Sequence, residues 1–137
     1  MKIQITGIGS YIPALKIHNT DFDKHVFLNE DGSAFAYPND VVISKFKGIT
    51  GIEQRRYAED HLNSSDLAFF ASEKAIEDAK IDPETIDYII YAHNFGDVNH
   101  GTIQTDTLPS LATRVKNKLQ IKNPKCVAYD ILFGCPG

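Results

Sequence analysis

The stretch that decides the fold is Cys126-Val127-Ala128-Tyr129-Asp130-Ile131-Leu132-Phe133-Gly134-Cys135-Pro136-Gly137. Its apolar run from Cys126 to Ile131 predicts a buried strand. A second continuous apolar run, Tyr88 to Ala92, is typical of a strand that is covered on both faces. Between the two runs, residues 107–119 carry an apolar stripe at helical spacing. Strand, helix and strand in this order predict an α/β protein with a mixed, mainly parallel sheet and packed helices.

The same alternation continues toward the start of the chain. Residues 2–9 alternate isoleucines with polar or small residues and predict another strand. Asn63 and the two serines after it offer N-cap oxygens to a helix that runs to Ala79, whose small alanines would let a neighbouring element approach closely. Residues 19–26 and 41–47 favour short helices, and Gly48 and Gly51 bracket a turn. The predicted core comprises Ile3, Ile5, Leu67, Phe70, Ile89, Ile90, Leu111, Val115, Val127 and Ile131.

Composition limits the classes of function. A chain of 137 residues with 42% hydrophobic residues predicts one globular domain, residues 1–137. A net charge of −4 argues against nucleic acid as the partner. No apolar stretch approaches the roughly 20 residues of a membrane helix, and no signal peptide follows Met1, so we expect a cytoplasmic protein. Two cysteines without a C-x-x-C pair indicate neither a disulfide framework nor a zinc site, and we expect no metal and no bound cofactor.

Cys135 is the candidate for chemistry. It follows a predicted strand, between Gly134 and Pro136, where α/β enzymes place a nucleophile on a tight turn. A free cysteine is equally well a small buried hydrophobe, and the spacing alone leaves both interpretations open. Cys126, at the start of the same run, is expected to be inert core. Because the chain ends two residues after Cys135, before any helix could follow, we interpret it as a fragment of a thiol enzyme.

Four stretches give the chain a family resemblance: Gly7-Ile8-Gly9-Ser10-Tyr11-Ile12-Pro13, Thr50-Gly51-Ile52-Glu53-Gln54-Arg55-Arg56, residues 75–92, and residues 130–137 around the thiol. In order and spacing they resemble the N-terminal part of a β-ketoacyl-acyl-carrier-protein synthase III, of the thiolase-like condensing-enzyme superfamily. The resemblance covers nearly the whole chain except about residues 22–45 and implies a layered, thiolase-like half-fold.

The resemblance implies a specific chemistry. Cys135 would take an acyl group from a thioester, and a malonyl group on acyl-carrier protein would decarboxylate and attack the acyl-enzyme, as in fatty acid biosynthesis. A helix after the nucleophile would lower the pKa of the thiol. The family's histidine and asparagine belong to a C-terminal half, so we expect residues 1–137 to be inactive alone. The implied partners are acyl-carrier protein, an acyl thioester of coenzyme A or of a carrier, and a second copy in a homodimer.

Three positions depart from the family or qualify the resemblance. Lys45 stands where members often stack a tryptophan on the adenine of coenzyme A, and Ile49 stands where they often carry an arginine near its phosphates. A carrier-bound donor therefore fits the chain as well as acetyl-coenzyme A does. Leu108 matches the position from which the family's partner subunit gates the acyl tunnel, although its place in the helical stripe is equally that of a core residue.

Two alternatives stay open. A self-contained thiol acyltransferase or hydrolase would pair Cys135 with His93, with Asn94 as a further candidate, and both of these residues also lie at a strand end. A non-catalytic module could instead bind an acyl carrier through a group of five cations, on which an acidic protein could dock. These are Arg114, Lys116, Lys118, Lys122 and Lys125.

Overall fold

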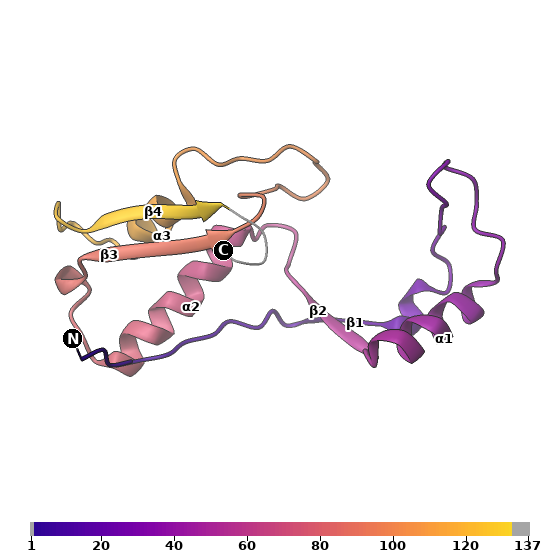
Figure 1. Ribbon diagram of the computed structural model, residues 1–137, viewed down its shortest axis with the longest axis horizontal. Coiled ribbons are helices and arrows are strands. Elements are labelled where there is room, and N and C mark those ends of the chain that lie inside the picture. The colour runs from indigo at the N-terminus through magenta and orange to yellow at the C-terminus, as the bar shows by residue number, and fades with distance from the viewer. Residues whose placement is uncertain (1, 133–137) are drawn as a thin grey trace. The chain divides into compact units, whose positions relative to one another are not determined.

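The computed structural model describes residues 2–132, which form two compact units. One unit contains residues 13–59, and the other contains residues 2–12 and 60–132. The larger unit holds helix α2 (Ser64–Ala79), a short 3₁₀ helix (Pro83–Thr85), strand β3 (Tyr88–His93), helix α3 (Leu111–Lys118) and strand β4 (Val127–Leu132) (Figure 1). None of the helices described is long and apolar enough to cross a membrane.

Strands β3 and β4 form a parallel pair, in which Tyr88 lies opposite Val127 and His93 opposite Leu132. Helix α3 makes the crossover between them and contacts both strands. The α/β prediction with parallel pairing is therefore confirmed, and Ile89 lies in the same sheet as Val127. The arrows of β3 and β4 point the same way in Figure 1, so their carboxyl ends share one edge.

Residues 2–9 do not form the predicted strand. They run extended along α2, and no strand of the described chain pairs with them. The Ile8 backbone N–H donates to Asp78 of α2 at 3.0 Å, and Lys74 donates to the Ser10 carbonyl at 2.9 Å. A Cβ on Gly7 would lie 2.5 Å from the Ala75 carbonyl oxygen, so the small residues of α2 do permit the expected close approach. Ile3 and Ile5, predicted as core, are exposed, whereas Gly7 and Gly9 lie against α2.

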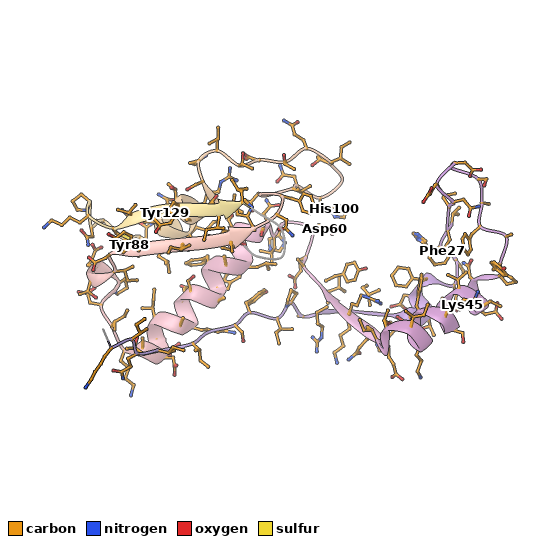
Figure 2. The ribbon with its side chains drawn as sticks, in the orientation of Figure 1. Phe27, Lys45, Asp60, Tyr88, His100 and Tyr129 are labelled. Carbon is orange, nitrogen blue, oxygen red and sulfur yellow. The ribbon has the colours of Figure 1, made fainter. Side chains whose placement is uncertain are left out.

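The parallel pair is covered on one face only within residues 2–132. Ile89, Tyr91 and His93 of β3 and Ala128 and Asp130 of β4 are partly shielded, whereas the residues that alternate with them are exposed. The prediction that Ile90, Val127 and Ile131 are core is therefore wrong for the described chain, because they are 54%, 48% and 42% exposed on the face opposite α3. Tyr88 and Tyr129, labelled in Figure 2, share this open face. Leu111 and Val115 are confirmed as core, at 0% and 2% exposure, and Cys126 is buried as expected.

Helix α3 begins four residues later than predicted. Ser110 caps it: its Oγ accepts from the Thr113 backbone N–H at 3.2 Å. Pro109, expected inside the first turn, precedes the helix, and so does Leu108. Leu108, the first residue of the predicted apolar stripe, therefore lies outside the helix.

The unit of residues 13–59 is built on an antiparallel pair, β1 (Leu15–His18) with β2 (Gln54–Tyr57), and on helix α1 (Asn39–Thr50). The helix expected over residues 19–26 is shorter, a 3₁₀ helix at Asn19–Phe22. Helix α1 is longer than predicted and runs through Gly48 to a left-handed cap at Gly51. The Asn39 side chain donates to the Asp23 carbonyl at 2.7 Å and to the His25 carbonyl at 2.8 Å, which holds the preceding loop against α1.

Candidate functional site

The candidate site lies at the edge where the carboxyl ends of β3 and β4 meet the amino ends of α2 and α3. In parallel α/β sheets, chemistry gathers outside the carboxyl ends of the strands. Two buried carboxylates organise this edge. Asp130 projects from β4 and Asp97 from the loop after β3, and each binds the backbone of a helix that is distant in sequence.

Asp130 joins three elements. Its Oδ2 accepts from the Leu111 backbone N–H at 2.7 Å, and its Oδ1 accepts from the Ala112 N–H at 2.7 Å. His93, the last residue of β3, contacts Oδ2 through Nε2 at 3.0 Å. Burial by itself raises the pKa of Asp130, but the Ala112 N–H, His93 and the Leu111 N–H outweigh it, so the pKa lies below its ordinary value. Asp130 is therefore a buried, ionised carboxylate that fastens β4 to β3 and α3.

His93 is fully engaged inside the protein. Its side chain is 4% exposed, and its Nδ1 accepts from the Gly96 backbone N–H at 2.9 Å. Since Nδ1 is an acceptor, the ring is the neutral tautomer with its proton on Nε2, which donates to Asp130. Neither nitrogen is open to take a proton from a thiol. The geometry weighs against the alternative in which His93 is the base for Cys135.

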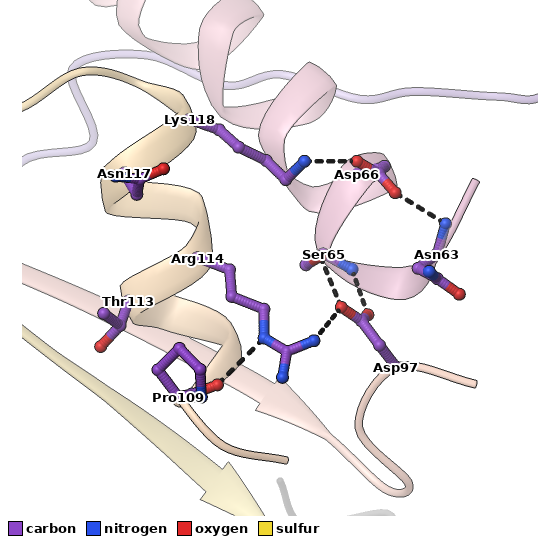
Figure 3. Close-up of a pocket in the computed structure, with 9 residues that line it drawn as sticks. All are labelled: Asn63, Ser65, Asp66, Asp97, Pro109, Thr113, Arg114, Asn117 and Lys118. Carbon is purple, nitrogen blue, oxygen red and sulfur yellow. Dashed lines mark hydrogen bonds and ion pairs between the residues drawn. The ribbon is translucent and has the colours of Figure 1, made fainter. Parts of the chain in front are cut away.

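Asp97 holds the amino end of α2. Its Oδ1 accepts from the Ser65 backbone N–H at 2.8 Å, and its Oδ2 accepts from the Ser65 hydroxyl at 2.7 Å and from Arg114 at 2.9 Å (Figure 3). Asp66, one residue on, accepts from the Asn63 N–H at 2.8 Å and pairs with Lys118 at 2.7 Å. Burial raises the pKa of Asp66, but the hydrogen bonds from Lys118 and Asn63 lower it by more, so the pKa lies below its ordinary value. These groups line a pocket of about 400 Å³ between α2 and α3.

Tyr91 lies beneath the same edge. Its hydroxyl is 2.7 Å from Ser64 Oγ, and its ring lies 5.4 Å from the ring of His93. Burial raises the pKa of Tyr91, and the charges of Asp97 and Asp130 raise it further against the opposing bond from Ser64. The phenol therefore stays protonated and serves to join α2 to β3.

The sequence-predicted site residues are only partly described by the structure. Cys135 lies outside the described residues, three positions beyond the end of β4. Leu108 is 82% exposed in the loop before α3, so it is not a core residue of the described chain. Asn94 follows β3 directly. His93 and Asp130 are brought together, although only His93 was singled out from the sequence.

Lys45 and Ile49, the two α1 positions that depart from the family, have different surroundings. The ammonium of Lys45, which Figure 2 labels, lies 4.6 Å from the centroid of the Tyr37 ring, a cation–π contact within the smaller unit. Ile49 is exposed. Lys45 therefore has an aromatic neighbour, but that neighbour belongs to its own chain.

Three of the five clustered cations are used internally. Arg114 pairs with Asp97 and Asp106, Lys118 pairs with Asp66, and Lys116 donates to the carbonyls of Asn123 and Cys126. Cations already paired with carboxylates contribute little attraction to an acidic partner. The cluster gives little support to a carrier-docking surface on α3.

The sequence did not predict the roles of Asp97 and Asp130, or that Arg114 pairs with the buried Asp97. A carboxylate inside the apolar run of β4 was the one available signal, because a buried charge requires partners. The partners themselves, Leu111 and His93, lie 19 and 37 positions away and leave no local pattern.

Comparison with known proteins gives the chain its relatives. It is 36% identical over 137 residues to the β-ketoacyl-acyl-carrier-protein synthase III of Staphylococcus haemolyticus, covering 100% of this chain and 36% of that protein. Over its whole length, the chain is thus similar to the N-terminal part of β-ketoacyl-acyl-carrier-protein synthase III proteins. No family model matches the chain.

Solved structures are similar to the chain in fold. A synthase III from Thermus thermophilus superposes with a TM-score of 0.66 at 26% identity, covering 98% of this chain and 35% of that one. A 3-oxoacyl-acyl-carrier-protein synthase from Burkholderia xenovorans gives a TM-score of 0.71 at 23% identity, covering 96% and 32%. The thiolase-like fold expected for the synthase III family is thereby confirmed. The chain spans about a third of the length of the curated relatives it matches, 36% in the first.

Proposed function

We propose that the chain is the nucleophile-bearing part of a β-ketoacyl-acyl-carrier-protein synthase III acting in fatty acid biosynthesis. The observation that carries the proposal is the relationship over all 137 residues to a synthase III at 36% identity. The sequence after β4, Phe133-Gly134-Cys135-Pro136-Gly137, supplies the thiol that this chemistry needs.

The proposed reaction has two stages. The Cys135 thiolate attacks the carbonyl of an acyl thioester and forms a new C–S bond, while the donor's C–S bond breaks and the donor leaves as a thiolate, which takes a proton from solvent. A malonyl group on acyl-carrier protein then loses carbon dioxide, and the resulting carbanion attacks the acyl group on Cys135. A carbon–carbon bond forms, the C–S bond breaks, and the thiolate returns for the next cycle. The donor is an acyl thioester of coenzyme A or of a carrier protein.

The surroundings of the site support this assignment in two ways. The Asp130 and Asp97 contacts fix the strand end that leads to Cys135 against α2 and α3. His93, the one residue proposed as a base within the chain, is committed to Asp130 and Gly96. This favours a reaction whose remaining catalytic groups come from outside residues 1–137. A homodimer, a cytoplasmic location and acyl-carrier protein as partner belong to the same proposal, because the family resemblance implies them.

The experiment compares residues 1–137 with the protein encoded when translation continues downstream of Gly137. We expect malonyl-dependent condensation by the longer protein and none by the 137-residue chain. Cys135→Ala in the longer protein should abolish transfer of the acyl group, whereas Cys126→Ala, at a buried position, should preserve it. Condensation that survives Cys135→Ala would refute the proposed function.

A further inference from the structure

One face of the strand pair β1–β2 brings two cations directly opposite each other. Lys16 of β1 lies opposite Arg56 of β2, and His18 lies opposite Gln54. Side chains of opposite residues project from the same face of a strand pair, and so do those of residues two positions apart along a strand. These four residues therefore share one face, and all of them are exposed. We call this surface the cationic face.

No carboxylate of the described chain compensates the two cations. The ion pairs within residues 2–132 include neither Lys16 nor Arg56. Arg56 donates through Nη1 to the Pro13 and Ala14 carbonyls, at 3.2 Å each, and these hydrogen bonds orient the guanidinium without removing its charge. In this respect the cationic face differs from α3, where two of the clustered cations are paired with aspartates.

The arrangement works against the fold. Like charges directly opposite each other in an antiparallel pair are destabilising. The other face of the same strands contributes to the fold instead, since Ile17 and Arg55 are partly buried there and Arg55 donates to the Asn19 side chain at 3.2 Å. Residues that serve function are often retained at a cost in stability. An anionic partner outside the chain therefore explains the opposed cations better than any contact within it.

The shape of the cationic face favours a large partner. Sites for small molecules are concave and enclose most of the ligand. The four residues instead project from an exposed two-stranded ribbon. The hollow of about 290 Å³ that His18 borders contains the 2.6 Å ion pair of Lys47 with Glu53, so the cation in it is already compensated. A protein that presents several carboxylates on one surface matches exposed cations that are spaced along a ribbon.

We propose that the cationic face is a docking surface for an acidic protein, the acyl-carrier protein of the proposed function. The identity of the partner rests on that proposed function. Carboxylates of the carrier lie against Lys16 and Arg56, and the amide of Gln54 offers further N–H donors beside them. Docking therefore uses β1 and β2, rather than the cluster of cations on and after α3.

The test measures the Kd of a fluorescently labelled bacterial acyl-carrier protein for the longer protein that contains this chain. Lys16→Gln and Arg56→Gln should each raise the Kd about two- to fivefold, the range that single exposed ion pairs supply. The difference from the unmutated protein should shrink as salt is added, because exposed charges are screened. Lys24→Gln is the matched control. It removes the same charge from an exposed position of the same unit, outside both strands, and should leave the Kd unchanged.

Stability separates docking from a structural role. Lys16→Gln should leave the urea midpoint of the smaller unit unchanged or raise it, because the substitution relieves the like-charge opposition. Affinity for the carrier and stability should thus not fall together. Arg56→Gln also removes the hydrogen bonds to Pro13 and Ala14, so where it unfolds the smaller unit, Lys16→Gln decides alone.

Three outcomes would overturn the proposal. Lys16→Gln could bind the carrier as tightly as Lys24→Gln does, or it could lower the urea midpoint, which would assign Lys16 to the fold. The unmutated protein could also bind a short DNA duplex at least as tightly as the carrier, which would make the cationic face a general polyanion surface. The proposed function is tested separately, by malonyl-dependent condensation with the unmutated longer protein. If condensation occurs and the Lys16 variant binds the carrier normally, only the docking surface is refuted.

Discussion

Two aspartates bind helix amino ends that are remote from them in sequence. Asp130 accepts from Leu111 and Ala112, and Asp97 accepts from Ser65. The unpaired N–H groups of a first helical turn carry a partial positive charge, which a carboxylate complements. Burying a carboxylate without such partners is costly. The helix N–H groups therefore make it possible to bury Asp130 and Asp97, and the two carboxylates in turn satisfy N–H groups that would otherwise lack acceptors. At the residue scale, the strand ends are fixed by charge as much as by packing.

The first prediction concerns Asp130. Replacing it with asparagine should lower the free energy of unfolding of the larger unit by about 1–3 kcal/mol, because buried N–H groups lose an ionised acceptor. Urea unfolding of the chain measures this. Asp60→Asn is the control, since that carboxylate is exposed and its one ion pair within residues 2–132 is with the exposed His100. It should change the free energy by less than about 0.5 kcal/mol.

The same variant should change the response to acid. The pKa of Asp130 is lowered in the folded protein, so its contribution is present above the unfolded-state pKa of about 3.9 and is lost as pH falls through the lower folded value. Asp130→Asn should therefore reduce the loss of stability between about pH 5 and pH 2. An acid-unfolding curve with the same slope in both proteins would contradict this account.

At the scale of elements, Gly7 and Gly9 bring the chain close to the backbone of α2. A Cβ on Gly9 would approach the Ala71 carbonyl oxygen and the Ala75 nitrogen, both backbone atoms that cannot move aside. We predict that Gly9→Ala destabilises the larger unit by about 1–3 kcal/mol. In contrast, Gly48→Ala, inside α1 with nothing near the added carbon, should stabilise the smaller unit by about 0.5–1 kcal/mol. Chemical denaturation of both variants tests the pair.

Elements whose signal is internal could be predicted from sequence. The apolar period of α2 and α3 and the apolar runs of β3 and β4 lie within the elements themselves. Which face of each strand is buried could not be predicted, because an apolar run does not indicate what covers it. Ile90 and Ile131 lie on the exposed face of the strand pair. Residues 2–9 failed as a strand for a related reason, since a strand needs a neighbour and their described contacts are with α2. The same holds for the site: His93 could be singled out from the sequence, but its hydrogen bond to Asp130 could not be predicted.

A further prediction concerns the helix expected after Cys135. The amino ends of α2 and α3 are already bound to Asp97 and Asp130, so we expect a thiolate at Cys135 to depend on N–H groups that follow it in the chain. Iodoacetamide should modify Cys135 more slowly at neutral pH in residues 1–137 than in the longer protein. Buried Cys126 provides an internal reference that should react slowly in both. Equal rates at Cys135 would contradict the prediction.

At the scale of the whole molecule, one face of the parallel pair is apolar and open. Tyr88, Ile90, Val127, Tyr129 and Ile131 are all exposed there. Contiguous exposed apolar surface promotes association. We predict that residues 1–137 form dimers or larger species, seen by light scattering, and that Ile90→Lys shifts them toward monomer. Ile49→Lys is the control, an exposed isoleucine in the smaller unit that should leave the distribution unchanged. A monomeric unmutated chain at micromolar concentration would contradict this.

The carboxylate caps have a consequence for hydrogen exchange. First-turn amide hydrogens usually exchange quickly, because no carbonyl within the helix accepts from them. The amides of Ser65, Leu111 and Ala112 instead donate to side chains that are themselves buried. Their exchange therefore requires the strand ends to separate from the helices, rather than a helix end to fray. Slow exchange at these amides would make them reporters of how often the edge of the sheet opens in solution.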